Sequence, residues 1–426
     1  LTSLLPRVLV LLQARAKQSA ASCGTCMRAL HAWLAANHAA SLSQLHASHY
    51  PLLEAMLSGL EAAQSDALNE ASAEALLEIM AVENTPIDGG ATPDYVCAAV
   101  EWLHARLQDI AARVGLMAAL TAEDSASAAD DGRLLQLCRA YCGFAERCAS
   151  LAATATDGSF LVLAETMLAV LGCRDLRLAE LTADFWLNVQ DCAVGARREQ
   201  MREPLFRRVA ETTLRQCSLP AGFTQWYDAE VDEDDFVRFR EQLGTDILSS
   251  CFSLLRAELV STLGAAISSA CNGGASLSWT TLECALWAVR ALHPDLTQAL
   301  QEPTSGLPTP QAAALHAAVE GLLAGIFQTL ATFNPTDQPP ALVISVVQLS
   351  GTYGKWLNAH SADALHGYVR LTLTALARCP AATVPAAGSF RSLCIHGRGS
   401  LATSQFIGQL LDATKVHLSD GRSLDA

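Results

Sequence analysis

Apolar residues recur at steps of three and four positions along most of this chain, and short polar breaks separate the resulting segments into pairs. One clear stripe consists of Phe236, Phe239, Leu243, Ile247, Cys251 and Leu254. Such steps place all the apolar side chains on one side of a helix. Few stretches alternate with the period of two that a half-buried strand requires. The sequence therefore predicts an all-α fold.

The helical segments come in pairs that repeat about every forty residues, the spacing of HEAT-type repeats. With 426 residues, the chain exceeds the size at which a single compact core keeps growing. Its apolar share is carried by Ala and Leu, which are strong helix formers. We therefore expect an α-solenoid of HEAT-like antiparallel helix pairs forming a curved superhelix, with residues 1–426 as one solenoid segment. A large helical bundle is the structural alternative.

Both ends of the sequence suggest a fragment of a longer protein. The chain begins at Leu1 instead of Met and stops in the polar stretch Ser419–Ala426. Between the helices, the small and acidic residues of Thr121–Gly132 indicate a mobile loop, and Pro303–Pro310 indicates a linker.

The charge balance argues against a nucleic-acid partner and favours a basic protein partner. The net charge is −15 and there are only three lysines, so no basic stripe is available to neutralise nucleic-acid phosphates. An acidic surface fits a basic protein partner, and it fits ordinary solubility as well. The apolar run Phe160–Cys173 is too short to cross a bilayer and contains Glu165, so we expect no membrane partner.

The fourteen cysteines follow no repeating spacing and fall mostly on expected helices. A chain that is neither short nor loop-rich is no disulfide scaffold, which favours free thiols in a reducing compartment. Cys23 and Cys26, with His31 and His38 downstream, resemble half of a zinc site. Because no second cysteine pair follows and Leu30 and Trp33 share their helix face, we interpret these cysteines as packing residues and expect no metal.

No motif for covalent chemistry occurs in the sequence. HExxH, GxSxG and the phosphate-binding GxxxxGK[ST] are absent. Gly351–Lys355 resembles the end of a phosphate loop, but Trp356 stands where Ser or Thr is needed. We therefore expect no catalytic residues, no cofactor and no enzyme activity.

The densest charge cluster lies just before the Phe236 stripe. Six acids occupy eight positions, namely Asp228, Glu230, Asp232, Glu233, Asp234 and Asp235. Acids at the start of a helix suit the positive end of its dipole, so one interpretation is a solvated capping loop. Capping needs only one or two of them. We therefore treat Asp232, Glu233, Asp234 and Asp235 as candidate protein-binding residues for a basic partner.

Several blocks of sequence resemble one family in its own order. They are Met27–Leu34 (MRALHAWL), Asp184-Phe185-Trp186, Asp234-Asp235-Phe236-Val-Arg-Phe239-Arg240, Ser278-Trp279 through Leu286, Leu365–Leu376 and Phe390–His396. Together they resemble the middle of importin-β-type nuclear transport receptors (karyopherins-β), and within them the transportin-SR branch, which imports Arg/Ser-rich splicing factors.

The resemblance implies a monomeric receptor that acts by binding alone and shuttles between cytoplasm and nucleus. Its partners would be protein cargo, Arg/Ser-rich or otherwise basic, the GTPase Ran, and Phe-Gly nucleoporins. The family's Ran-binding repeats would precede Leu1, and its arginine-rich cargo helix would follow Ala426. A HEAT scaffold for protein assembly, unconnected with nuclear transport, is the first alternative. An all-helical enzyme is the second, and it would need a convergent polar pocket.

Overall fold

In this computed structural model, the residues described are 5–16, 19–37, 41–63, 65–82, 94–122, 125–155, 158, 160–220, 222–229, 232–272, 279–301, 309–402 and 408. Four sequence predictions lie wholly or mainly outside them, namely those for His38, Glu230, the Pro303–Pro310 linker and the C-terminal stretch Ser419–Ala426. Within the described residues all regular structure is helical and no strand occurs, which confirms the all-α prediction.

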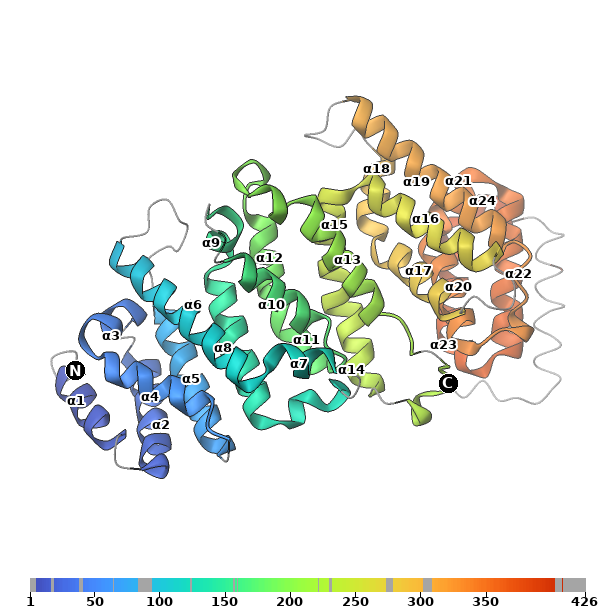
Figure 1. Ribbon diagram of the computed structural model, residues 1–426. Coiled ribbons are helices and arrows are strands. Elements are labelled where there is room, and N and C mark those ends of the chain that lie inside the picture. Colours follow the sequence, from blue (N-terminus) through green and yellow to red (C-terminus); the bar gives the residue numbers. More distant parts are fainter. Residues whose placement is uncertain are drawn as a thin grey trace. The chain divides into compact units, whose positions relative to one another are not determined.

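The chain divides into two compact units (Figure 1). Unit 1 comprises Leu1–Gln216 and Glu230–Phe239, and unit 2 comprises Cys217–Ala229 and Arg240–Ala426. Each is built from paired helices, as expected of a solenoid. The interpretation of residues 1–426 as a single solenoid segment stays a prediction.

Unit 1 contains two rows of helices. Its elements are α1 (Leu5–Ala16), α2 (Ala20–Asn37), α3 (Leu42–Ser48), α4 (Tyr50–Leu60), α5 (Asp66–Val82), α6 (Asp94–Val114), α7 (Leu116–Thr121), η2 (Ser125–Asp130), α8 (Gly132–Arg147), α9 (Ala149–Thr154), α10 (Leu161–Leu171), α11 (Leu176–Ala179), η3 (Glu180–Thr182), α12 (Ala183–Asp191), η4 (Val194–Ala196), η5 (Glu199–Met201), α13 (Glu203–Gln216) and α14 (Glu233–Arg238). One row runs α2, α5, α8 and α12, each packed on the next. The other runs α1, α4, α6 with α7, α10 and α13. Each helix pair thus buries its apolar face against its neighbours.

Unit 2 repeats this plan. Its elements are η6 (Trp226–Asp228), α15 (Thr245–Leu255), α16 (Ala257–Asn272), α17 (Trp279–Ala291), α18 (His293–Gln301), α19 (Thr309–Leu330), η9 (Pro335–Asp337), α20 (Pro340–Thr352), α21 (Gly354–His360), α22 (Ala362–Arg378), η10 (Pro380–Ala382), α23 (Thr383–His396) and α24 (Arg398–Leu401). Helices α15, α17, α20 and α23 form one row. On the other side α16 packs on α19, and the hydroxyl of Tyr368 on α22 donates a 2.6 Å hydrogen bond to the carbonyl of Phe327 on α19.

The apolar stripes of the sequence lie in these interfaces. Phe185 and Trp186 are buried on α12 and their rings meet edge to face at 4.9 Å. The stripe from Phe236 is likewise buried at Phe239, Ile247 and Cys251. Steps of three and four residues therefore located the packed face of this stripe correctly, with Leu254 half-buried at its end.

Two local predictions were wrong. The stripe from Phe236 predicts one continuous α-helix, but a π-helical turn, η7 (Phe239–Gly244), lies between α14 and α15. This turn leaves Arg240 buried. The expected loop at Thr121–Gly132 contains the 3-10 helix η2, where the backbone N–H of Ala129 donates a 2.8 Å hydrogen bond to the buried carboxylate of Asp175. The polar, acidic composition of this segment did not predict its hydrogen bond to Asp175, which lies 46 positions further along the chain.

By length and composition alone, one described helix, Pro310–Leu330, is apolar enough to cross a membrane. It forms most of α19, which packs against α16 and α18. Only 39% of its apolar window is buried, and exposed His316 and Gly321 alternate with buried residues such as Leu323, so α19 buries one face against its neighbours.

Candidate functional site

The acidic residues singled out from the sequence lie at the start of α14. Asp232 is its N-cap, and its carboxylate accepts hydrogen bonds from the backbone N–H groups of Asp234 at 3.0 Å and Asp235 at 3.1 Å. These bonds satisfy two of the donors that a helix N-terminus leaves without partners. Asp232 therefore has a structural role.

Asp235 is also engaged. Its carboxylate lies 2.8 Å from the guanidinium of Arg238, which in turn contacts Glu180 of η3 at 3.1 Å. Glu180, together with Asp235, raises the pKa of Arg238 through hydrogen bonding. Asp235 thus belongs to a charge network that fixes α14 against the preceding repeat.

Glu233 and Asp234 differ from these two. Both side chains are exposed, and in the described part of the chain no cationic group lies within 4 Å of either. The structure therefore divides the four candidate residues into two that stabilise α14 and two whose charges point to solvent.

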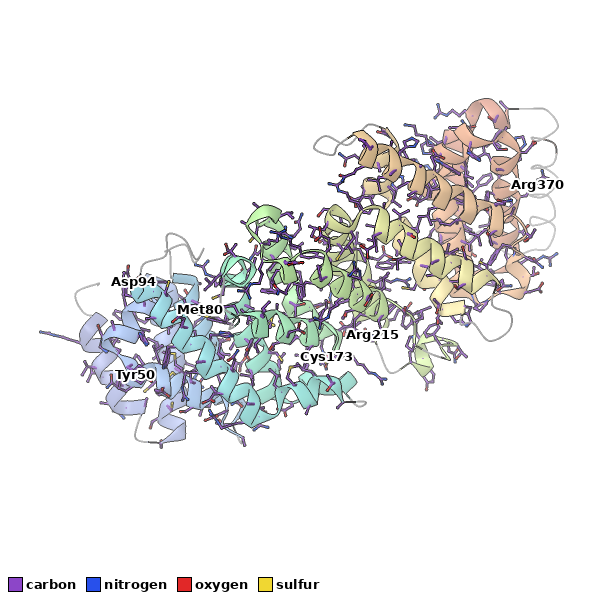
Figure 2. The ribbon with its side chains drawn as sticks, turned by 45° about the horizontal axis from the view of Figure 1, so that its top comes forward. Tyr50, Met80, Asp94, Cys173, Arg215 and Arg370 are labelled. Carbon is purple, nitrogen blue, oxygen red and sulfur yellow. The ribbon has the colours of Figure 1, made fainter. Side chains whose placement is uncertain are left out.

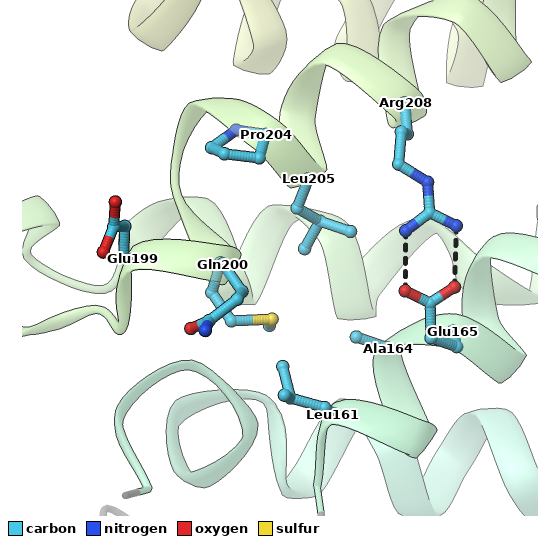
Figure 3. Close-up of a pocket in the computed structure, with 9 residues that line it drawn as sticks. Leu161, Ala164, Glu165, Glu199, Gln200, Pro204, Leu205 and Arg208 are labelled. Atoms are coloured by element: carbon cyan, nitrogen blue, oxygen red, sulfur yellow. Dashed lines mark hydrogen bonds and ion pairs between the residues drawn. The ribbon is translucent and has the colours of Figure 1, made fainter. Parts of the chain in front are cut away.

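A groove that the sequence did not predict lies between α10 and α13 in unit 1 (Figure 3). It has a volume of about 490 Å³, and buried Ala164, Met201 and Leu205 form its apolar floor. Glu165 and Arg208 form one rim through two parallel hydrogen bonds of 2.6 and 2.7 Å. Hydrogen bonding from Arg208 lowers the pKa of Glu165, so the pair is charged at neutral pH.

The opposite rim carries Glu199 and Gln200 on η5. Buried Arg197 holds this segment, because its Nε donates to the carbonyl of Cys192 at 2.9 Å and its Nη2 to that of Gln190 at 2.6 Å. Burial lowers the pKa of Arg197. In the sequence, the groove is marked only by a cluster of five arginines between positions 197 and 208. Composition cannot distinguish an arginine that binds backbone carbonyls from one that binds a ligand.

The size of the groove suits the binding of a small group. Its volume falls in the range of sites that take one or two side chains or a small ligand. Its lining contains no serine, cysteine or histidine to act as a nucleophile or base. A second groove of about 380 Å³ lies between α16 and α19 in unit 2, and its lining includes Gly264, Gly321 and Gly325.

The most deeply buried cysteines are poor nucleophiles in this fold. Burial raises the pKa of the Cys142 and Cys148 thiols well above the ordinary value. Cys23 and Cys26 are buried too, and His31 lies 3.6 Å from Glu74 instead of beside them. No cluster of three or more His, Cys, Asp or Glu side chains suited to a metal was found among the residues that the structure describes.

No family model and no curated protein matches this sequence. Solved structures do match. Importin 13 in its cytosolic state superposes with a TM-score of 0.69 at 15% sequence identity, covering 99% of this chain and 48% of that one. Kap121p superposes with a TM-score of 0.54 at 13% identity, covering 97% of this chain and 40% of that one. This chain therefore has the helical-solenoid fold of these proteins over about half their length or less.

Proposed function

We propose that this chain is a segment of a nuclear transport receptor of the karyopherin-β type, which carries protein cargo by binding and without catalysis. The observation that carries the proposal is the likeness to importin 13 along 99% of the chain. The order of sequence blocks, with Asp184-Phe185-Trp186 and the Asp234–Arg240 segment at its centre, supports the same family and its transportin-SR branch.

Control by Ran and shuttling between cytoplasm and nucleus follow from this proposal. The receptor segment would act as a monomer, and Phe-Gly nucleoporins would be its partners during passage. The α10/α13 groove, with an apolar floor under a charged rim, is a candidate site for a single nucleoporin phenylalanine.

The negative charge of the acidic residues indicates that their partner, whether cargo or regulator, is basic. Glu233 and Asp234 are exposed and unpaired among the described residues, in a chain of net charge −15. Such charges act mostly on the rate of encounter with a basic partner and are screened within about 8 Å at physiological salt. We therefore infer that Ran or a basic cargo contacts these residues.

A pull-down with Ran loaded with GTP or with GDP, using the full-length gene product, tests the receptor proposal. A karyopherin should retain Ran-GTP and release cargo, whereas a HEAT scaffold should bind neither form of Ran and keep its partners. Equal retention of both nucleotide forms, or of neither, would contradict control by Ran.

The acidic residues are tested by replacing Asp232, Asp234 and Asp235 with Asn and Glu233 with Gln, which removes charge and preserves capping. Partner binding should weaken and lose its dependence on salt, while loss of the partly exposed Asp235–Arg238 pair should lower the unfolding free energy by less than about 1 kcal/mol. Unchanged binding at low and high salt would leave only the capping role.

A further inference from the structure

An aromatic patch lies on the surface of unit 1, far along the chain from the acidic residues of α14. It consists of His46 on α3, Tyr50 on α4, and Tyr95 and Trp102 on α6. The ring of Trp102 lies 5.2 Å from His46 and 5.1 Å from Tyr50, between centroids. The indole N–H of Trp102 also donates a 3.0 Å hydrogen bond to the hydroxyl of Tyr50. Three helices therefore hold the rings of His46, Tyr50 and Trp102 in one fixed arrangement, and Tyr95 lies two helical turns before Trp102 on α6.

The patch is open to solvent although its members are aromatic. Tyr50 is 42% exposed and Tyr95 is 61% exposed, and Trp102 is half-buried. Tyr95, Ala98, Trp102 and Ala105 recur at helical spacing along one face of α6, and the two alanines are exposed beside the large rings. An ordered, accessible row of aromatic rings is typical of an interaction surface.

The charges around the patch define the partner. The guanidinium of Arg106 forms ion pairs with the carboxylates of Glu54 at 2.8 Å and Asp109 at 3.2 Å. Glu101 and Asp94 are exposed, and no cationic group lies within 4 Å of them in the described part of unit 1. Figure 2 labels Asp94 and Tyr50 on this part of the molecule. The patch thus combines aromatic rings with carboxylates that lack a counter-ion.

We propose that this aromatic patch binds an extended, arginine-containing segment of a partner protein. A guanidinium stacks on the face of Trp or Tyr and pairs with a nearby carboxylate, and arginine does both better than lysine. Tyr95 and Trp102 lie two helical turns apart, a rise of about 10 Å. Arginines three positions apart in an extended peptide span a similar distance. One arginine stacks on Trp102 beside Glu101, and the other on Tyr95 beside Asp94.

The test measures fluorescence anisotropy of a dye-labelled peptide, Gly-Arg-Gly-Gly-Arg-Gly-Gly, against the whole chain, with a lysine version and a glutamate version for comparison. The arginine peptide should bind most tightly and the glutamate peptide should not bind. Tyr95→Ala and Glu101→Gln should each weaken binding about fivefold, the effect of one cation–π contact or one exposed charge pair. Trp102→Leu should weaken it more.

Matched controls distinguish binding at this patch from a general attraction between a basic peptide and an acidic chain. Tyr227→Ala removes an aromatic ring that is 94% exposed in unit 2 and should leave binding unchanged. The variant in which Asp232, Glu233, Asp234 and Asp235 are neutralised should still bind the peptide, so the outcome does not depend on the proposed transport function. Because Tyr95 and Glu101 are exposed, their variants should keep the helical circular dichroism of the parent even if Trp102→Leu does not. Binding that is unaffected by Tyr95→Ala and Glu101→Gln, or equal for the arginine and lysine peptides, would overturn the proposal.

Discussion

Arg240 and Glu283 form a buried ion pair in unit 2, in which one guanidinium nitrogen lies 2.9 Å from each carboxylate oxygen. Ser345 on α20 donates a 2.6 Å hydrogen bond to the same carboxylate, and the guanidinium lies 4.7 Å from the ring centroid of Trp287. The pair thus connects η7, α17 and α20. The carboxylate of Glu283 therefore accepts hydrogen bonds from both Arg240 and Ser345 and links elements of successive helix pairs.

Removing one member of this pair should destabilise unit 2 strongly. Glu283→Ala leaves the Arg240 guanidinium buried without its counter-ion, for which we expect a loss of about 3–5 kcal/mol in unfolding free energy. Urea unfolding followed by circular dichroism measures it. The double variant Arg240→Met with Glu283→Leu removes both charges and should recover much of the loss. If the double variant were as unstable as Glu283→Ala, the loss would come from packing and not from charge.

A second prediction concerns Phe185 on α12. Its side chain is 1% exposed and α12 packs on α8 and α9, so Phe185→Ala should cost about 3–5 kcal/mol. In a solenoid, coupling passes from neighbour to neighbour, so hydrogen exchange should accelerate in α8, α9 and α12 before α2. Asn188, exposed on the same helix, provides the control variant Asn188→Ala. Equal acceleration along all of unit 1 would contradict nearest-neighbour coupling.

These two sites show what local sequence can and cannot predict. Phe185 follows Leu178 and Leu181 at steps of three and four residues, and such an apolar stripe reports directly on which helix face is buried. The pairing of Arg240 with Glu283 could not be predicted in this way. The two residues lie 43 positions apart, and the π-helical turn shifts the side chains that follow it. From residue type alone, an arginine beside an apolar stripe is expected to be exposed to solvent. Arg240 is buried because Glu283, which is distant in the sequence, pairs with it.

The candidate site was predictable to a similar extent. The density of acids before Phe236 located the start of α14, and Asp232 occupies the capping position that its residue type favours. The engagement of Asp235 by Arg238 required the fold, as did the α10/α13 groove. The lining of this groove comes from three separate elements, and Arg197, by binding two carbonyls, helps to hold η5 at the rim.

A third prediction follows from His293, which is half-buried and meets the ring of Tyr353 at 5.0 Å between centroids. Burial, and secondarily the nearby His396, lowers its pKa below the ordinary value of 6.5. The unfolded chain therefore binds the proton more readily than the folded one. Stability from this group is complete above pH 6.5 and is lost as the pH falls from there through the lower, folded-state pKa.

We expect His293→Gln to reduce the loss of stability between pH 7.5 and pH 5.5, measured by urea unfolding at both values. His316→Gln is the matched control, because His316 is exposed on α19. A pH dependence that is the same in the parent and in His293→Gln would assign the acid sensitivity to other groups.

The last prediction separates the two roles within the acidic segment of α14. Asp232→Ala removes the acceptor for the backbone N–H groups of Asp234 and Asp235 and should cost about 1 kcal/mol, whereas Asp232→Asn should restore most of this. Glu233→Gln with Asp234→Asn keeps the cap and removes two solvent-facing charges that also favour the positive end of the helix, so its cost at physiological salt should be about 0.5–1 kcal/mol, with the capped amides still protected from exchange. Hydrogen exchange at the Asp234 and Asp235 amides, together with thermal unfolding, measures both effects. The salt dependence of partner binding should show the reverse order, with the Glu233 and Asp234 variant losing more than Asp232→Asn. If Asp232→Asn weakened binding as much as the double change, the partner would contact the cap itself, and the division of roles between Asp232 and its exposed neighbours would be wrong.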